Sequence, residues 1–123
     1  MIDKIRSLIE ELDIKAYTPE LPQEESNVCA VTRLGGTHVN CINNKVLYKE
    51  MNGRVIFRGT ENDDQTFLKT NEIIQKLHLS RNISYSGGKI INIICSLPTY
   101  VGKDENQRIL YNITFTSKYE EVS

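Results

Sequence analysis

Apolar residues recur every three or four positions at the start of the chain. They are Ile2, Ile5, Leu8, Ile9 and Leu12, with charged residues between them. This spacing predicts a helix with one buried stripe that ends near Asp13. A second helix is predicted from about Asp63 to His78, because Asn62 or Asp63 can cap its start. Its shared face is expected to hold Phe67, Thr70, Ile74 and Leu77.

Most of the remaining chain has the pattern of short strands. They are predicted at residues 14–17, 28–34, 46–48, 54–59, 83–85, 89–97 and 108–119. The last of these alternates most clearly, with Ile109, Tyr111, Ile113 and Phe115 on one face and Asn112, Thr114 and Thr116 on the other. Such alternation is typical of a half-exposed antiparallel strand. The apolar run 90–94 instead predicts a central strand buried on both faces, with a helix on one side.

Turn and loop signals separate these strands. The segment from Pro19 to Pro22 predicts a loop with a polar tip at Gln23 to Asn27. Gly35-Gly36 stops one strand, and Asn52-Gly53 predicts a hairpin turn between the strands at 46–48 and 54–59. Residues 37–45 are polar and predict no element.

The order of elements predicts an α+β fold, a mainly antiparallel sheet with two helices packed against it. At 123 residues, of which 25% are charged and 39% hydrophobic, the chain is expected to form one globular domain over residues 1–123.

Charge and cysteine content narrow the class of protein. Fifteen Lys and Arg against sixteen Asp and Glu give a net charge of −1, which argues against a domain held to DNA by counterion release. A net charge near zero leaves little electrostatic repulsion between copies, which is compatible with self-association and equally with a monomer. Three widely spaced cysteines predict no disulfide framework and indicate a reducing compartment. The N-terminus lacks the apolar core of a signal peptide and no run has membrane-spanning length, so synthesis in the cytoplasm without a membrane partner is expected.

Candidate chemistry is sparse. His38 and Cys41 would supply only two metal ligands, and His78 lies at the end of the second predicted helix. Cys29 and Cys95 fall in apolar strands, where cysteine usually behaves as a small core residue. The adjacent carboxylate pairs at 24–25 and 63–64 do not converge, and the Gly-Gly-Lys at 87–89 lacks the spacing of a phosphate loop. No enzyme activity, metal or cofactor is predicted.

The polar connection from Thr99 to Gln107 leaves two interpretations open, a solvated link between strands and a contact loop. An aromatic residue and an arginine near mixed charges are typical of protein interfaces. The candidate contact residues are Tyr100, Lys103, Asp104 and Arg108, joined by Arg54 and Arg58 as exposed charges on a strand.

Two blocks of the sequence carry a family resemblance. The first is Leu21-Pro22, a polar stretch, Asn27-Val28-Cys29-Ala30-Val31 and Leu34-Gly35-Gly36; the second is Ser96-Leu97-Pro98-Thr99-Tyr100-Val101-Gly102-Lys103-Asp104-Glu105-Asn106-Gln107-Arg108. They resemble the minor capsid or tail-completion family of tailed phages and prophages of low-GC Gram-positive bacteria. Residues 41–45 depart from the family, where an aromatic or Pro-rich lead is expected.

The resemblance implies a structural virion protein, a tail terminator. Such a subunit forms a hexameric ring with copies of itself at the head-proximal end of the tail tube, where it stops tube growth and joins the tail to the head connector. Its partners are the tail tube protein and the connector protein, and DNA passes through the lumen without specific binding. The resemblance implies no cofactor, and it leaves open whether the tail is contractile or flexible and whether the ring forms in solution.

A ring of one subunit type needs two different faces that meet head to tail. One is expected at the sheet edge with the 99–108 connection, and the other at the loop from Pro19 to Asn27. On this view Arg108→Glu leaves a folded monomer that cannot cap tails. The alternatives are a head-completion or connector adaptor protein and, from another class, a small host enzyme or ligand-binding domain.

Overall fold

The computed structural model describes residues 1–35, 38–42 and 45–121, with side chains described outside 36–47. Within this part of the chain it contains two helices and one sheet of eight strands, so the predicted α+β class is confirmed. The elements are α1 (Ile2–Glu10), β1 (Lys15–Tyr17), β2 (Val28–Arg33), β3 (His38–Ile42), β4 (Lys45–Arg58), α2 (Asp63–Leu77), β5 (Arg81–Tyr85), β6 (Gly88–Cys95), β7 (Thr99–Lys103) and β8 (Ile109–Glu121).

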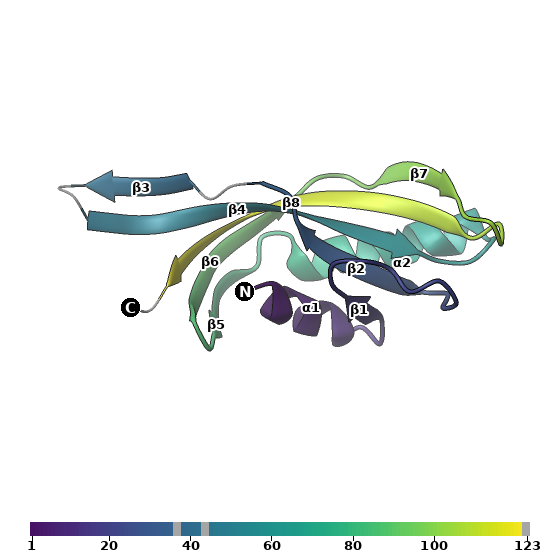
Figure 1. Ribbon diagram of the computed structural model, residues 1–123, viewed down its shortest axis with the longest axis horizontal. Helices are drawn as coiled ribbons and strands as arrows, with labels where there is room; N and C mark the ends of the chain where they lie inside the picture. The colour runs from purple at the N-terminus through teal and green to yellow at the C-terminus, as the bar shows by residue number, and fades with distance from the viewer. Residues whose placement is uncertain (36–37, 43–44, 122–123) are drawn as a thin grey trace.

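The two longest strands, β4 and β8, form the middle of the sheet. The strand order is β1-β2-β4-β8-β6-β5, and only the β1–β2 pair is parallel. Two further strands extend this path at opposite ends: β3 pairs with β4, and β7 pairs with β8. Figure 1 shows β3 and β7 at the two ends of the molecule's longest axis.

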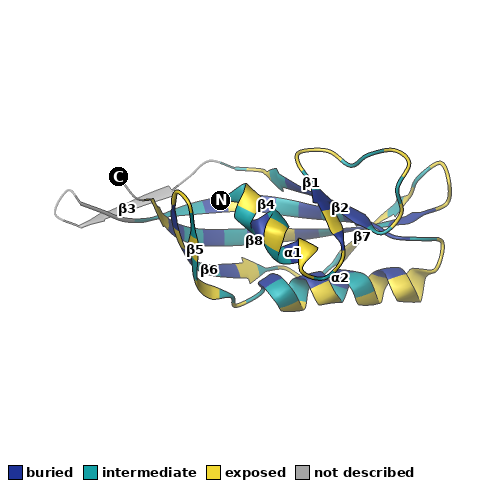
Figure 2. Ribbon diagram, turned by 90° about the horizontal axis from the view of Figure 1, so that it is seen from below, coloured by how far each residue is buried: buried dark blue, intermediate teal, exposed yellow. Residues whose placement is uncertain are grey.

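Both helices lie on one face of the sheet, as the view from below shows (Figure 2). The predicted alternation of β8 is confirmed, since its odd-numbered residues from Ile109 to Tyr119 are buried against the helices. Ile5 and Ile9 of α1 and Ile73 and Leu77 of α2 complete this core. Burial of large aliphatic side chains, each contributing about 1.5–3 kcal/mol, holds the helices to this face.

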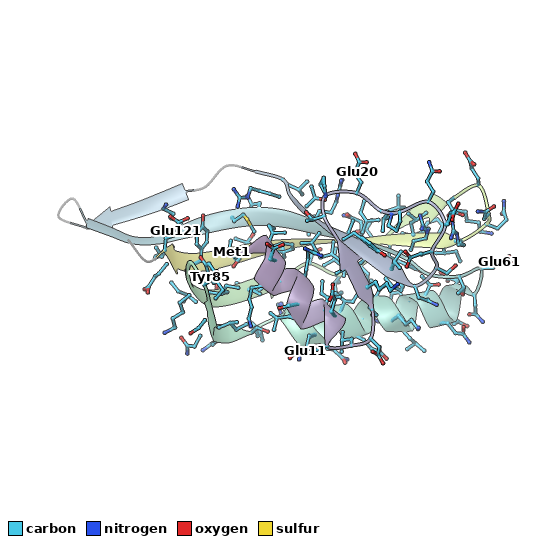
Figure 3. All side chains as sticks on the ribbon, turned by 60° about the horizontal axis from the view of Figure 1, so that its bottom comes forward. Met1, Glu11, Glu20, Glu61, Tyr85 and Glu121 are labelled. Carbon is cyan, nitrogen blue, oxygen red and sulfur yellow. The ribbon has the colours of Figure 1, made fainter. Side chains whose placement is uncertain are left out.

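The opposite face of the sheet carries no helix in the described residues. The loop at residues 18–27 lies over one end of it, where Thr32 Oγ1 donates a hydrogen bond of 2.7 Å to the carbonyl of Pro19. Figure 3 places Glu20, in this loop, on the other side of the sheet from Glu11, at the end of α1. Beyond the loop this helix-free face is open.

The predicted Asn-Gly turn at Asn52-Gly53 is wrong. β4 runs through it without interruption, because it pairs with β2 on one side and β8 on the other. Gly53 lies opposite Phe115, and a Cβ at Gly53 would come within 2.2 Å of Phe115 Cζ. The glycine is therefore required by the aromatic ring across the strand and not by a turn. Strand β3 was not predicted at all, and the centre of its connection to β4 lies outside the described residues.

Two further expectations need correction. β6 is not buried on both faces, because Ile94 is about half exposed on the helix-free face. The buried face of α2 holds Thr66, Thr70, Ile73 and Leu77, and Phe67 is exposed. The predicted cap is confirmed, since Asn62 Oδ1 accepts a hydrogen bond from the N–H of Gln65 at 3.1 Å. No helix in the described part of the chain is long and apolar enough to span a membrane.

Candidate assembly surface

The expected polar loop from Thr99 to Gln107 is instead a strand and a tight turn. β7 pairs antiparallel with β8, and the turn at 104–108 joins them. Asp104 fixes this turn: its Oδ1 accepts the N–H groups of Asn106 and Arg108, both at 2.9 Å, and its N–H donates to the carbonyl of Arg108 at 2.9 Å. A turn closed by its own aspartate has a defined shape.

Two arginines converge on the same aspartate. Arg108 Nε lies 2.8 Å and Arg58 Nε 3.7 Å from Asp104 Oδ2. Arg58 and Arg108 are only 5% and 8% exposed. We refer to Arg58, Asp104 and Arg108 as the clamp. Buried arginines of this kind need partners for their N–H groups, because an unpaired buried charge is costly.

Backbone carbonyls of the 18–27 loop supply these partners. Arg108 Nη2 donates to the carbonyl of Gln23 at 2.7 Å, and Arg58 Nε donates to that of Glu25 at 3.0 Å. Arg58 Nη2 also donates to the carbonyls of Pro22 and Glu25. The loop and the β7–β8 turn are thus held together at one end of the molecule. The two segments expected to form separate ring faces are parts of one surface.

The electrostatics of the clamp follow from two positive charges sharing one carboxylate. Burial, with a contribution from neighbouring Arg108, lowers the pKa of Arg58 from its ordinary value. Burial acts to raise the pKa of Asp104, but hydrogen bonds from the N–H groups of Arg108 and Asn106 and from the Arg108 side chain outweigh it, so this pKa is lowered. The carboxylate is therefore charged at neutral pH and holds the arginines together.

Near the clamp, β7 and the connection that precedes it present apolar side chains to solvent. Leu97 is 83%, Tyr100 54% and Val101 56% exposed. The pairing with β8 shifts between Tyr100 and Gly102, so Val101 is the extra residue of a β-bulge. Gly102 has φ of 145°, a conformation that favours glycine. We refer to Leu97, Tyr100 and Val101 as the edge strip.

An aromatic group supports the edge strip from the helix side. The Tyr111 ring makes edge-to-face contacts with Tyr100, at 5.9 Å between centroids, and with Phe67 of α2, at 5.6 Å. The Tyr111 hydroxyl donates a hydrogen bond of 2.6 Å to Asp63 Oδ1. This hydrogen bond, followed by burial, raises the pKa of Tyr111 to about 12. Tyr100 is thus exposed but already held in place, which lowers the conformational entropy lost when a partner binds it.

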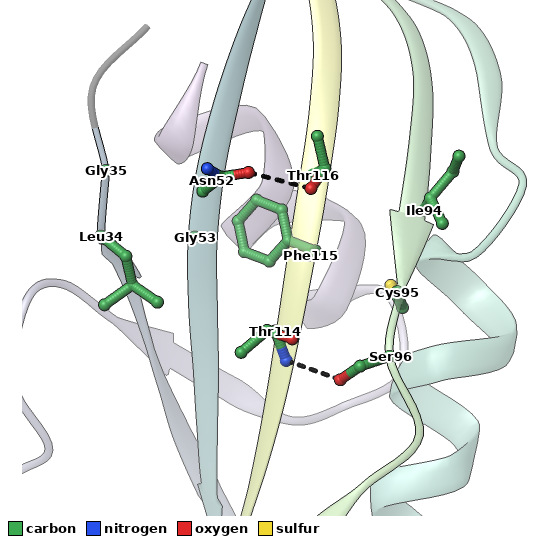
Figure 4. A pocket seen from close by; sticks show the side chains of 10 residues that line it. All are labelled: Leu34, Gly35, Asn52, Gly53, Ile94, Cys95, Ser96, Thr114, Phe115 and Thr116. Carbon is green, nitrogen blue, oxygen red and sulfur yellow. Dashed lines mark hydrogen bonds between the residues drawn. The ribbon is translucent and has the colours of Figure 1, made fainter.

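A groove of about 550 Å³ lies on the helix-free face (Figure 4). Leu34 and Ile94, each about half exposed, stand at its two sides. Its floor is polar, with Thr116 Oγ1 donating to Asn52 Oδ1 at 2.9 Å and the N–H of Thr114 donating to Ser96 Oγ at 3.0 Å. These bonds satisfy the floor within the chain, so the groove has the character of an ordinary open sheet surface.

Five of the six candidate contact residues divide into two groups. Tyr100 and Lys103 are exposed, whereas Asp104, Arg58 and Arg108 belong to the clamp. The expectation that Arg58 is an exposed charge is wrong, because its position at the end of β4 lies beneath the 18–27 loop.

Arg54 lies on the same face of β4, partly buried, with no hydrogen-bond partner for Nε among the described residues. Leu97 and Val101, which the sequence analysis passed over, are more exposed than the arginines. The sequence signal for an exposed Val101 is the glycine that follows it, since a glycine within a strand often marks a β-bulge.

The remaining candidate groups are structural where they are described. Burial raises the pKa of the Cys29 thiol to about 12 and that of Cys95 to about 11, as expected of core cysteines. His78 Nδ1 accepts a hydrogen bond from the N–H of Cys95 at 3.0 Å, so the imidazole satisfies the last backbone N–H of β6. The side chains of His38 and Cys41 lie outside the described residues. Among the residues that are described, no three His, Cys, Asp or Glu side chains converge as metal ligands.

No protein-family model and no curated protein matches this chain.

Proposed function

We propose that this protein is a structural subunit of a phage tail, a tail terminator that forms a ring at the head-proximal end of the tail tube and joins it to the head connector. The ring has six copies in the family that the chain resembles. The observation that carries the proposal is the edge strip, three exposed apolar side chains on β7 and the connection before it, of which Tyr100 is supported by the Tyr111 ring. Exposed apolar side chains in a cluster are typical of surfaces that meet another protein. The resemblance of residues 21–36 and 96–108 to tail-completion proteins supports the same function.

The clamp contributes to this function indirectly. By fixing the turn at 104–108 against the 18–27 loop, it sets the shape of the surface beside the edge strip. A preformed surface loses less conformational entropy on binding than a flexible one. Arg58 and Arg108 are thus proposed as residues that position the surface, while Leu97, Tyr100 and Val101 make the contacts.

The test uses deletion of the gene from the phage or prophage that carries it, with electron microscopy of the induced particles. Overlong tails beside filled, unjoined heads are expected. Tails of normal length that fail to join heads would replace the terminator with a head-completion adaptor. Normal joined particles would overturn an assembly function altogether.

Complementation of the deletion then assigns the surface. A gene carrying Leu97→Asp is expected to leave tails overlong, because the aspartate places a charge in an apolar contact. Leu79→Asp is the matched control, because Leu79 is 59% exposed on the α2–β5 connection, away from the edge strip. It is expected to restore normal particles. If both variants restored normal particles equally, the edge strip would not take part in tail termination.

A further inference from the structure

In the described part of the chain, four strands have one unpaired edge each, namely β1, β3, β5 and β7. Of these, β3 and β7 are the two that lie at opposite ends of the longest axis (Figure 1). In the described part of the chain, β3 pairs only with β4, and β7 pairs only with β8. The outer edge of such a strand presents N–H and C=O groups that can pair with a strand of another chain. β3 and β7 each contain five residues, so the two edges match in length.

The β3 edge is carried on an arm, formed by β3 and residues 45–50 of β4. The arm extends beyond the helices and the remaining strands (Figure 1). The pairing of β4 with β8 begins only at Lys49, so the outer part of the arm is a two-stranded ribbon. An isolated ribbon of two strands is marginally stable in water and gains stability from a third strand.

The free edges of β3 and β7 are placed for a head-to-tail contact. They lie at opposite ends of the longest axis (Figure 1), so one end of a copy can meet the other end of the next. A contact between two different surfaces of one chain repeats from copy to copy and forms a ring when the rotation between copies closes.

We propose that β3 of one copy pairs with the free edge of β7 in the next copy, which continues the sheet from subunit to subunit. The inference rests on the proposed ring and names its subunit interface. The pairing brings the arm against the edge strip, which shields Leu97, Tyr100 and Val101 from water. A net charge of −1 leaves little repulsion between copies. The bulge at Val101 and the turn after Lys103 confine the pairing to a single short strand.

The test exploits the two-ended nature of this contact. One variant lacks the arm, with residues 36–47 replaced by Gly-Asn-Gly, and keeps an intact β7. The other carries Val101→Asp and keeps an intact arm. Leu79→Asp again serves as the control, since Leu79 is as exposed as Val101. Circular dichroism checks the fold of each purified chain, and sedimentation velocity at the highest soluble concentration measures its assembly.

Wild type and Leu79→Asp are expected to form oligomers, and each of the two interface variants alone is expected to be monomeric. Mixed together, the two interface variants are expected to form a species of one copy of each and nothing larger, because only one compatible pair of ends remains. Failure of the mixture to associate, a monomeric wild type, or oligomers of Val101→Asp alone would overturn the interface. Should the armless variant not fold, Val101→Asp against Leu79→Asp still decides the edge.

Tail length in the deletion strain is measured separately. A protein that terminates tails but assembles through other surfaces would therefore be recognised.

Discussion

The two ends of the molecule are built in different ways. At the β7 end, buried arginines tie a turn to a loop more than eighty residues away in the chain, with one bond spanning 85 positions. At the β3 end, β3 and the start of β4 extend beyond the rest of the sheet. In the described residues, β3 is held by its backbone pairing with β4. An interface between these ends would join the β7 end, whose shape the clamp holds, to the arm at the β3 end, which has fewer contacts. Most of the ordering on binding would then occur in the arm.

Removal of Arg108 is expected to give the largest effect on the clamped end. Arg108→Ala leaves Asp104 without its closest cation and the carbonyl of Gln23 without a donor. It should destabilise the protein by about 3 kcal/mol, measured by urea unfolding, because it breaks a buried ion pair. Limited proteolysis should then cut the 18–27 loop. Lys103→Ala, an exposed neighbour, is the control and should change stability by less than about 0.5 kcal/mol. Equal stability of the two variants would show that the clamp does not hold this end.

The burial of Arg108 also changes the expected result of Arg108→Glu. The sequence analysis predicts a folded monomer for that variant. Next to Asp104 and beneath the 18–27 loop, a glutamate would instead add a buried negative charge. Loss of fold would therefore precede any loss of contact.

The centre of the sheet, between the two ends, is expected to show the next largest effect. Gly53→Ala places a Cβ against the Phe115 ring and should cost about 1–3 kcal/mol through overpacking. Phe115→Leu in the same chain should recover part of that cost, because the shorter side chain removes the clash. A double-mutant cycle measured by urea unfolding checks this. Strictly additive effects would mean that the ring is not what requires glycine.

Acid should weaken the clamped end selectively. The pKa of Asp104 is lower in the folded chain than in the unfolded one, so the folded state holds fewer protons. Its contribution to stability is full at neutral pH and is lost as the pH falls below about 4. Urea unfolding across this pH range should show a shallower decline for Asp104→Asn than for the wild type. Identical pH profiles of the two proteins would show that Asp104 is not the source of the acid sensitivity.

The smallest effect on stability is expected at the arm. Replacing residues 36–47 by Gly-Asn-Gly should change the free energy of unfolding by less than about 0.5 kcal/mol, because the helices and the core remain. Hydrogen exchange should be fast in β3 and slow in β8 of the free wild-type chain. A destabilisation as large as that of Arg108→Ala would show that the arm supports its own subunit.

Elements with strong local patterns were predicted well from the sequence. The cap at Asn62, the stripe of α1 and the alternation of β8 each depend on residues close together in the chain. Asn52-Gly53 was misread because its local preference for a turn loses to pairing on both sides of β4. One of the two partners is β8, whose Phe115 opposite Gly53 lies far along the sequence.

Around residues 96–108, the sequence predicts exposure for the wrong side chains. Charged residues suggested contacts, yet Arg58 and Arg108 are buried by a loop whose carbonyls they bind. No local pattern reports that a distant loop will cover a strand end. The apolar Leu97 and Val101 are the exposed residues, and apolar residues in a strand ordinarily predict burial.

The 85-residue span between Gln23 and Arg108 has a consequence for the order in which the chain folds during translation. A nascent chain that has not reached Arg108 can hold the 18–27 loop through Thr32 and Arg58 but has no donor for the Gln23 carbonyl, so the loop is not yet joined to the 104–108 turn. The helix α1 and the first strands leave the ribosome well before this loop has its last partner. The binding-competent surface therefore matures late, and interrupted translation products are poorly equipped to join an assembly.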